Sequence, residues 1–302
     1  MTTTRRPAPV TTRARQLLGL AALVSVAATI WLGLWVTPAG VNMGNRVRLL
    51  YIHPPVAWVA YLAFGVTAIA SLLYLWPRTR ARVWDRLAAA SAEVGVVFCG
   101  LTLVSGSIWG RATWGVWWTW GARLTSTALL FVMYLGYLAL RRVPADAHTR
   151  ATRSALAALL AFVDVPVSYL SVYWWRTLHQ TGTVLDPQRE VHVHGIMAWT
   201  LLLGFCAFTI SYVWMVVHRY RVEVMAEQLE HMDLTVALQE RRSEPATTPA
   251  GPAPTISRPE PATRPLVPPA PVPVAVAPAP RAAGGLPAPG GQDGPDRQAV
   301  AP

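Results

Sequence analysis

Charged residues are scarce in this sequence, and lysine is absent. Only 14% of the 302 residues are charged and 53% are hydrophobic, whereas soluble domains average about 25% charged residues. The net charge of +11 would suit a nucleic-acid-binding protein, but every basic residue is an arginine and most stand in short clusters between apolar runs. Such clusters are typical of the loops that set membrane topology, so we expect no nucleic acid partner.

Cysteine is rare too, and the motifs of hydrolases and nucleotide-binding enzymes are missing. The two cysteines, Cys99 and Cys206, lie inside apolar runs, and no CxxC occurs. This favours small buried side chains over a thiol-redox or zinc-thiolate site. No Ser-His-Asp, paired-carboxylate or phosphate-loop pattern is present, so we expect a chain that is not an enzyme.

Long apolar runs dominate the first two thirds of the chain. Each run comes within a few residues of the length of about 20 that crosses a bilayer as a helix, and none shows the alternation of barrel strands. We therefore predict an all-α fold, a polytopic integral membrane bundle of six transmembrane helices. The six runs are 17–36, 56–76, 88–109, 124–140, 155–175 and 191–217.

Arginines are denser on one side of these spans than on the other. They cluster before the first run and after the second, fourth and sixth. Because cytoplasmic loops carry the excess of basic residues, we expect cytoplasmic N- and C-termini. Three loops then face outward, namely 37–55, 110–123 and 176–190.

The chain is expected to divide into four segments. A cytoplasmic N-terminal segment (1–16) precedes the six-span membrane domain (17–219). In 220–242, apolar residues recur at helical spacing, which predicts a cytoplasmic amphipathic helix; they are Val222, Met225, Leu229, Met232 and Val236. The tail, 243–302, is rich in proline, alanine and glycine and is predicted to be disordered.

Tryptophans crowd the second outer loop, 110–125. Five of them lie between Trp109 and Trp120, interrupted by glycines. One interpretation is an aromatic belt, because tryptophan is enriched at membrane–water interfaces. The other is a binding platform, since flat indoles suit a large planar apolar ligand and arginine suits its peripheral carboxylate. The crowding into one short loop favours the platform.

Three stretches carry a resemblance to a known family. Residues 114–126 resemble the tryptophan-rich WWD signature of heme-handling proteins in cytochrome c maturation, and the version ending in Arg-Leu-Thr is most similar to the CcmC, or heme exporter protein C, family. Residues 51–58 and 171–180 resemble that family's first-loop and third-loop histidine motifs. The resemblance covers about 17–219. Gly121 stands where the signature usually has Asp, which bears on the structure of the loop and on partner binding.

The resemblance implies a heme b site, non-covalent and transient, at the outer membrane surface. By motif position, His53 and His179 are the axial ligands of the iron, a role that imidazole fills well. Arg48 and Arg123 become partners of the heme propionates or edge. The heme would lie flat against the indoles of Trp114, Trp117, Trp118 and Trp120. Pro54 and Pro55 fit the first turn of a helix, so His53 is expected just outside the second span.

The function implied by the resemblance is to hold heme in the bacterial inner membrane and deliver it during cytochrome c maturation. The implied partners are a membrane-anchored periplasmic heme chaperone, ABC transporter subunits of the same system, a small single-span accessory protein and membrane lipid. Two alternatives stand beside it. A b-type electron-transfer protein would bury axial histidines mid-span, and none lies there. A transporter would show repeats or interrupted helices, and Pro166 near Asp164 is a position where a helix could be interrupted.

Other polar residues have weaker signals. His192 and His194 form an HxH pair, which alone is a weak indication of a metal site. Glu93 lies near a cytoplasmic end and is expected to pair with an arginine such as Arg86. Asp164 either caps backbone groups freed by Pro166 or lines a polar pathway, and both readings stay open.

Overall fold

The computed structural model describes residues 12–40, 43–175, 178–179 and 193–243. The start of the N-terminal segment, most of the third outer loop with His192, and the tail from 244 lie outside the described residues.

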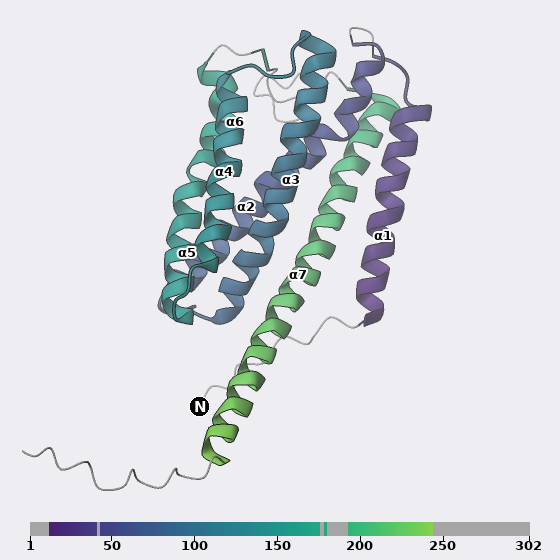
Figure 1. Ribbon diagram of the computed structural model, residues 1–302. Coiled ribbons are helices and arrows are strands. Elements are labelled where there is room, and N and C mark those ends of the chain that lie inside the picture. The colour runs from purple at the N-terminus through teal and green to yellow at the C-terminus, as the bar shows by residue number, and fades with distance from the viewer. Residues whose placement is uncertain (1–11, 41–42, 176–177, 180–192, 244–302) are drawn as a thin grey trace, which may run out of the picture. The chain divides into compact units, whose positions relative to one another are not determined.

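Every regular element in the described ranges is a helix (Figure 1). Six helical segments are long and apolar enough to cross a membrane, which confirms the predicted all-α, six-span, multi-pass membrane fold. The elements are α1 (Thr12–Trp31), η1 (Leu32–Val36), η2 (Asn45–Tyr51), α2 (His53–Leu75), α3 (Arg82–Trp114), α4 (Ala122–Arg142), α5 (Ala147–Phe162), α6 (Asp164–Trp174) and α7 (Gly195–Ser243).

The helices α2 and α3 form the centre of the bundle, and small side chains let them lie close together. α1 packs on α7 at one edge, and α4, α5 and α6 form the other edge (Figure 1). A Cβ atom at Gly95 would lie 2.7 Å from Cε1 of Phe64. The Phe64 ring in turn stacks on Tyr134 with centroids 3.7 Å apart. Helices in lipid associate largely through such close packing, so this contact joins α2, α3 and α4.

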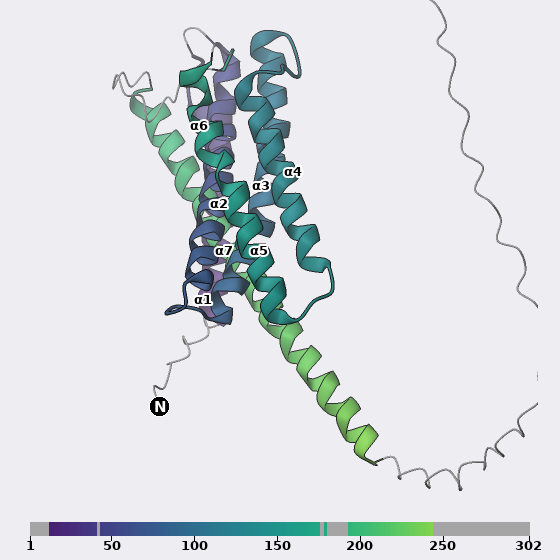
Figure 2. The same ribbon diagram turned by 90° about the vertical axis from the view of Figure 1, so that its left-hand side faces the viewer.

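The fifth span consists of two helices placed end to end, α5 and α6 (Figure 2). The break falls at Val163, just before Pro166, whose missing N–H interrupts the hydrogen-bond ladder. Asp164 begins α6, and its Oδ2 atom is buried without a hydrogen-bond partner in the described part of the chain. That oxygen therefore caps none of the backbone groups that the proline leaves free.

Ion pairs join the helices at the end that the arginine distribution assigns to the cytoplasm. Asp85 of α3 accepts two hydrogen bonds from Arg141 of α4, at 2.6 and 3.1 Å. Arg219 of α7 donates to Glu93 of α3, and Arg86 donates to Glu227. The expected pairing of Glu93 with an arginine is therefore confirmed, but the partner is Arg219 and not Arg86, because α7 supplies a partner to each of them.

Helix α7 runs without a break from Gly195 to Ser243. Its length is roughly 70 Å at 1.5 Å per residue, whereas a bilayer core is about 30 Å thick. It therefore extends past the other helices at one end (Figures 1 and 2). The sixth span and the segment 220–242 thus form one continuous rod.

Candidate functional site

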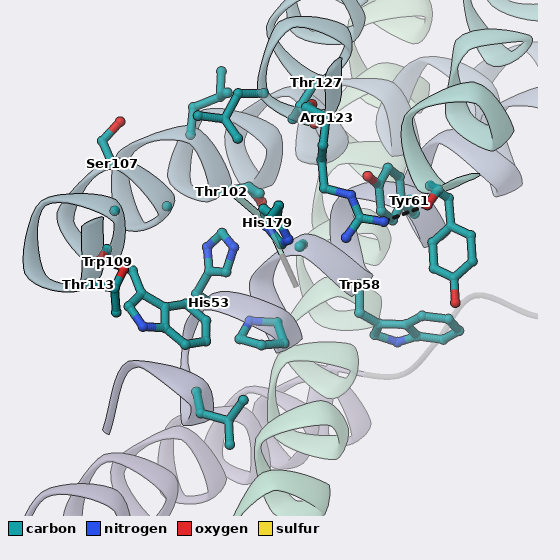
Figure 3. Close-up of a pocket in the computed structure, with 18 of the residues that line it drawn as sticks. His53, Trp58, Tyr61, Thr102, Ser107, Trp109, Thr113, Arg123, Thr127 and His179 are labelled. Carbon is teal, nitrogen blue, oxygen red and sulfur yellow. Dashed lines mark hydrogen bonds between the residues drawn. The ribbon is translucent and has the colours of Figure 1, made fainter. Parts of the chain in front are cut away.

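A cavity of about 880 Å³ lies between the helices at the opposite end of the bundle, the end assigned to the outside. Its walls come from α2, α3, α4, α6 and α7, and most lining side chains are apolar (Figure 3). Along α7 the lining extends from Leu201 to Ile210, which is about 14 Å of helix. The cavity therefore continues from the tryptophan-rich loop down between the spans, beyond the surface shelf that the sequence indicates.

His53 is the first residue of α2 and projects into this cavity (Figure 3). Pro54 and Pro55 occupy the first turn, where their missing N–H groups cost no helical hydrogen bond. The side chain is buried, with 9% of its surface exposed. Its Nδ1 atom lies 3.0 Å from the hydroxyl of Ser105, and its ring meets the indole of Trp109 edge-on at 5.5 Å between centroids.

His179 follows α6 and lines the same cavity. Its half-buried ring meets Trp114 with centroids 6.0 Å apart and planes at 64°. His53, His179 and Arg123 line the same cavity, although they come from three different parts of the chain. Figure 3 shows the two imidazoles and the Arg123 side chain directed toward the same space.

Arg123 stands at the beginning of α4, where it is held by backbone oxygens of α6. Its guanidinium donates to the carbonyls of Ser168 and Tyr169 and lies over the Tyr169 ring, 5.8 Å from the centroid. The Ser168 hydroxyl is 3.1 Å from both Tyr61 and Thr127. Within the described ranges no carboxylate pairs with Arg123, so its positive charge is available to an anionic group in the cavity.

The four indoles predicted to form a platform separate into two pairs. Trp114 and Trp118 line the cavity, whereas Trp117 and Trp120 lie outside its lining and are 59% and 83% exposed. Trp118 and Trp120 still touch, edge-on at 5.8 Å. The indole N–H groups of Trp109 and Trp118 are buried without an acceptor in the described part of the molecule. A buried donor normally finds a partner, so both N–H groups suit an anionic or carbonyl ligand.

Arg48, the other predicted arginine, belongs to η2 and lies outside the cavity lining. Its guanidinium donates to the carbonyl of Leu34 at the end of the first span. Of the two arginines selected by motif position, the structure brings only Arg123 to the cavity.

Gly121 is the residue that precedes the first turn of α4, and no side chain caps that turn. Asp at this position would accept hydrogen bonds from the free N–H groups of the helix. The departure from the family signature therefore falls at a helix cap two residues before Arg123, and it leaves the cavity lining intact.

Only one member of the His192–His194 pair belongs to the described part of the chain. His194 is exposed just before α7, and His192 lies outside the described residues. Within the described ranges no three His, Cys, Asp or Glu side chains lie close enough together to hold a metal ion. An iron held in a porphyrin needs only two protein ligands, so a heme site would not form such a cluster.

Sequence reasoning missed three residues on α3 that hold His53. Ser105 and Trp109 contact its ring, and a Cβ atom at Gly106 would lie 3.0 Å from its Cε1 atom. A signal was available, because small or polar residues recur along this face of an otherwise apolar span, at Thr102, Ser105, Gly106 and Thr113.

Comparison with known proteins gives the same family as the motifs. Residues 1–235 match the family model described as heme exporter protein C. Heme exporter protein C of Haemophilus influenzae is 36% identical over 199 residues, covering 66% of this chain and 79% of that protein. Its counterpart in Escherichia coli K12 is 34% identical over 177 residues (58% and 70%). A cytochrome c biosynthesis ccmC-like mitochondrial protein of Marchantia polymorpha is 33% identical over 182 residues (60% and 75%).

Proposed function

Because the chain belongs to the heme exporter protein C family, which handles heme for cytochrome c biogenesis, we propose that it binds heme b in the cavity and releases it to a membrane-anchored heme chaperone on the periplasmic side. The proposal includes residence in a bacterial inner membrane. It also includes association with the ABC transporter subunits of the maturation system and with a small single-span protein.

One observation carries this proposal: His53 and His179, from distant parts of the chain, line a single apolar cavity. Bis-histidine ligation takes one imidazole on each face of the macrocycle. The volume of about 880 Å³ lies in the range of about 300–1,000 Å³ that small-molecule and cofactor sites show. Heme, when bound, is the cargo, and the chain's own residues hold and orient it.

The polar groups fit the carboxylates of such a ligand. Among the described residues, the Arg123 guanidinium has no carboxylate partner, and the buried N–H groups of Trp109 and Trp118 have no acceptor. Charge-assisted hydrogen bonds of this kind are stronger than neutral ones. Trp117 and Trp120 are exposed beside the cavity, where they could contact the protein that takes the heme away.

The placement of the histidines disfavours the electron-transfer alternative. His53 begins α2 and His179 lies beyond α6, whereas transmembrane electron transfer through b-type hemes uses axial ligands within the spans. The break at Val163 favours a transporter as second candidate, because broken helices mark transporter sites. Heme uptake into liposomes containing this chain alone would support that candidate.

The proposed function is tested by titrating the purified chain in mild detergent with heme. We expect saturation at one equivalent and a low-spin, six-coordinate absorption spectrum. Adding the purified periplasmic chaperone should then transfer the heme to it. The proposal would be refuted if the chain bound no more heme than an unrelated membrane protein of similar size binds non-specifically.

Replacing either buried indole donor by phenylalanine tests the fit to the carboxylates. Trp109→Phe and Trp118→Phe keep an aromatic ring but remove the N–H group. A hydrogen bond to a charged acceptor contributes about 1.5 kcal/mol or more, so we expect heme to bind about tenfold more weakly to each variant. Equilibrium titration followed by heme absorbance measures this.

The exposed Trp117 supplies the matched control. Trp117→Phe should bind heme as the unmodified chain does. Heme dimethyl ester, which has no free carboxylates, should bind the two donor variants and the unmodified chain about equally. A tenfold loss that persists with the ester would show that the indoles act through packing instead.

A further inference from the structure

We propose that Ser105 is a positioning residue that fixes the tautomer of His53, so that Nε2 of the imidazole faces the cavity as a ready iron ligand. The inference rests on the proposed function for the ligand role. The structural support comes from contacts between α2 and α3, which the chain makes without heme.

The hydroxyl of Ser105 has two neighbours that compete for its single proton. It donates to the carbonyl of Thr102, at 3.3 Å, and lies 3.0 Å from Nδ1 of His53. A hydroxyl has one proton to donate and two lone pairs. The proposal assigns that proton to the Thr102 carbonyl, so that Ser105 accepts a hydrogen bond from the ring and Nδ1 carries the hydrogen.

The consequence falls on the other ring nitrogen. A neutral imidazole has one N–H, so a protonated Nδ1 leaves Nε2 with a free lone pair. Among the described residues nothing forms a hydrogen bond with Nε2 of His53, and the ring lines the cavity. The lone pair that an iron needs is therefore directed at the ligand space.

Gly106 and Trp109 keep the ring in this orientation. A Cβ atom at position 106 would lie 3.0 Å from Cε1 of His53, so any larger residue there would press on the ring. Trp109 borders the ring edge-on, with planes at 79°. Turning the ring over would place a carbon where Nδ1 now meets Ser105, and the hydrogen bond would be lost.

Ser105, as the hydrogen-bond partner of the ligating His53, also suits a protein that must release its heme. Groups that accept a hydrogen bond from a ligating histidine raise its basicity and fix its direction, and their loss costs about 10–100-fold in metal affinity. A neutral hydroxyl polarises the ring less than the carboxylate found behind many permanent metal ligands. Ser105 therefore gives direction with a modest gain in affinity.

The decisive test measures the tautomer without heme. The full chain, labelled with ¹⁵N in histidine and placed in lipid bilayers, is studied by solid-state NMR, and His53→Ala identifies the His53 signals. We expect a protonated Nδ1 and an unprotonated Nε2. In Ser105→Ala the signals should move toward a mixture of tautomers, and Ser105→Thr, which keeps the hydroxyl, should restore the original pattern.

Ser211→Ala is the matched control, because the Ser211 hydroxyl likewise donates to a carbonyl one turn earlier, on α7, but lies outside the cavity lining. It should leave the His53 signals unchanged. A protonated Nε2 in the unmodified chain, or an Ser105→Ala spectrum identical to that of the control, would overturn the role of Ser105.

The heme-loaded chain gives a second readout. Ser105→Ala should bind heme about tenfold more weakly and shift the midpoint potential upward, because a less basic imidazole stabilises the ferric iron less. Ser105→Thr should reverse both changes. Failure of the unmodified chain to bind heme would instead refute the proposed function, whatever tautomer the NMR spectrum shows, so the two failures are distinguishable.

Discussion

Replacing His53 by alanine is expected to convert the low-spin heme spectrum of the purified chain into a high-spin one and to weaken heme binding at least about tenfold. Loss of a residue that merely supports a ligating histidine already costs about 10–100-fold, so loss of the ligand should cost no less. The His53 side chain is buried and held from α3. Its removal therefore leaves a hole in the wall of the cavity.

His179→Ala should give the same change of spin state, because the second axial position then loses its ligand. Absorption and electron paramagnetic resonance spectra at matched heme concentration measure it. Added imidazole should restore the low-spin spectrum in His53→Ala, since the free molecule fits the space that the side chain vacates.

His218→Ala is the control for both variants. His218 is an exposed histidine of α7 that contacts Trp214 and lies outside the cavity lining. Its replacement should leave the spectrum unchanged. If both cavity variants keep a low-spin spectrum with unaltered affinity, the assignment of the two ligands is wrong.

The second large effect is expected on stability, from the ion pair of Asp85 and Arg141. Both side chains are only 13% exposed, and the guanidinium meets the carboxylate with two hydrogen bonds. Removing one partner of a buried pair leaves the other charge unpaired, which costs about 3–5 kcal/mol. Asp85→Ala should therefore lower the free energy of unfolding by about that amount, measured by reversible unfolding in mixed micelles.

A double-mutant cycle separates the pair from its surroundings. Asp85→Ala combined with Arg141→Met should be more stable than Asp85→Ala alone, because no buried charge then remains. The control is Arg82→Ala, since Arg82 is 60% exposed and 4.0 Å from Glu227, and exposed pairs contribute about 0–1 kcal/mol. An Asp85→Ala variant as stable as Arg82→Ala would contradict the prediction.

The six spans could be predicted from the sequence because they depend only on length and hydrophobicity. The partner of Glu93 could not, because several arginines lie at the same end and only the packing of α7 on α3 selects Arg219. The separation of Trp114 and Trp118 from Trp117 and Trp120 has the same cause. It depends on how the loop folds back over the helices, which no local pattern encodes.

The residues of the site likewise divide into those that the sequence could predict and those that it could not. Family motifs led to His53, His179 and Arg123, and all three line one cavity. Motif position also suggested Arg48, which the structure places against the carbonyl of Leu34. Ser105 escaped notice because it lies 52 residues from His53 and meets it only where α2 packs on α3. Local sequence patterns do not encode a contact between two residues so far apart in the chain.

Helix α7 reaches from the wall of the cavity to the far side of the membrane in one piece. Leu201 and Phe205 line the cavity, and on the same helix Arg219 and Glu227 are anchored to α3. A continuous helix bends little over this distance. The inner segment and the cavity wall thus belong to one helix, so a change in the tilt of α7 would also displace Leu201 and Phe205.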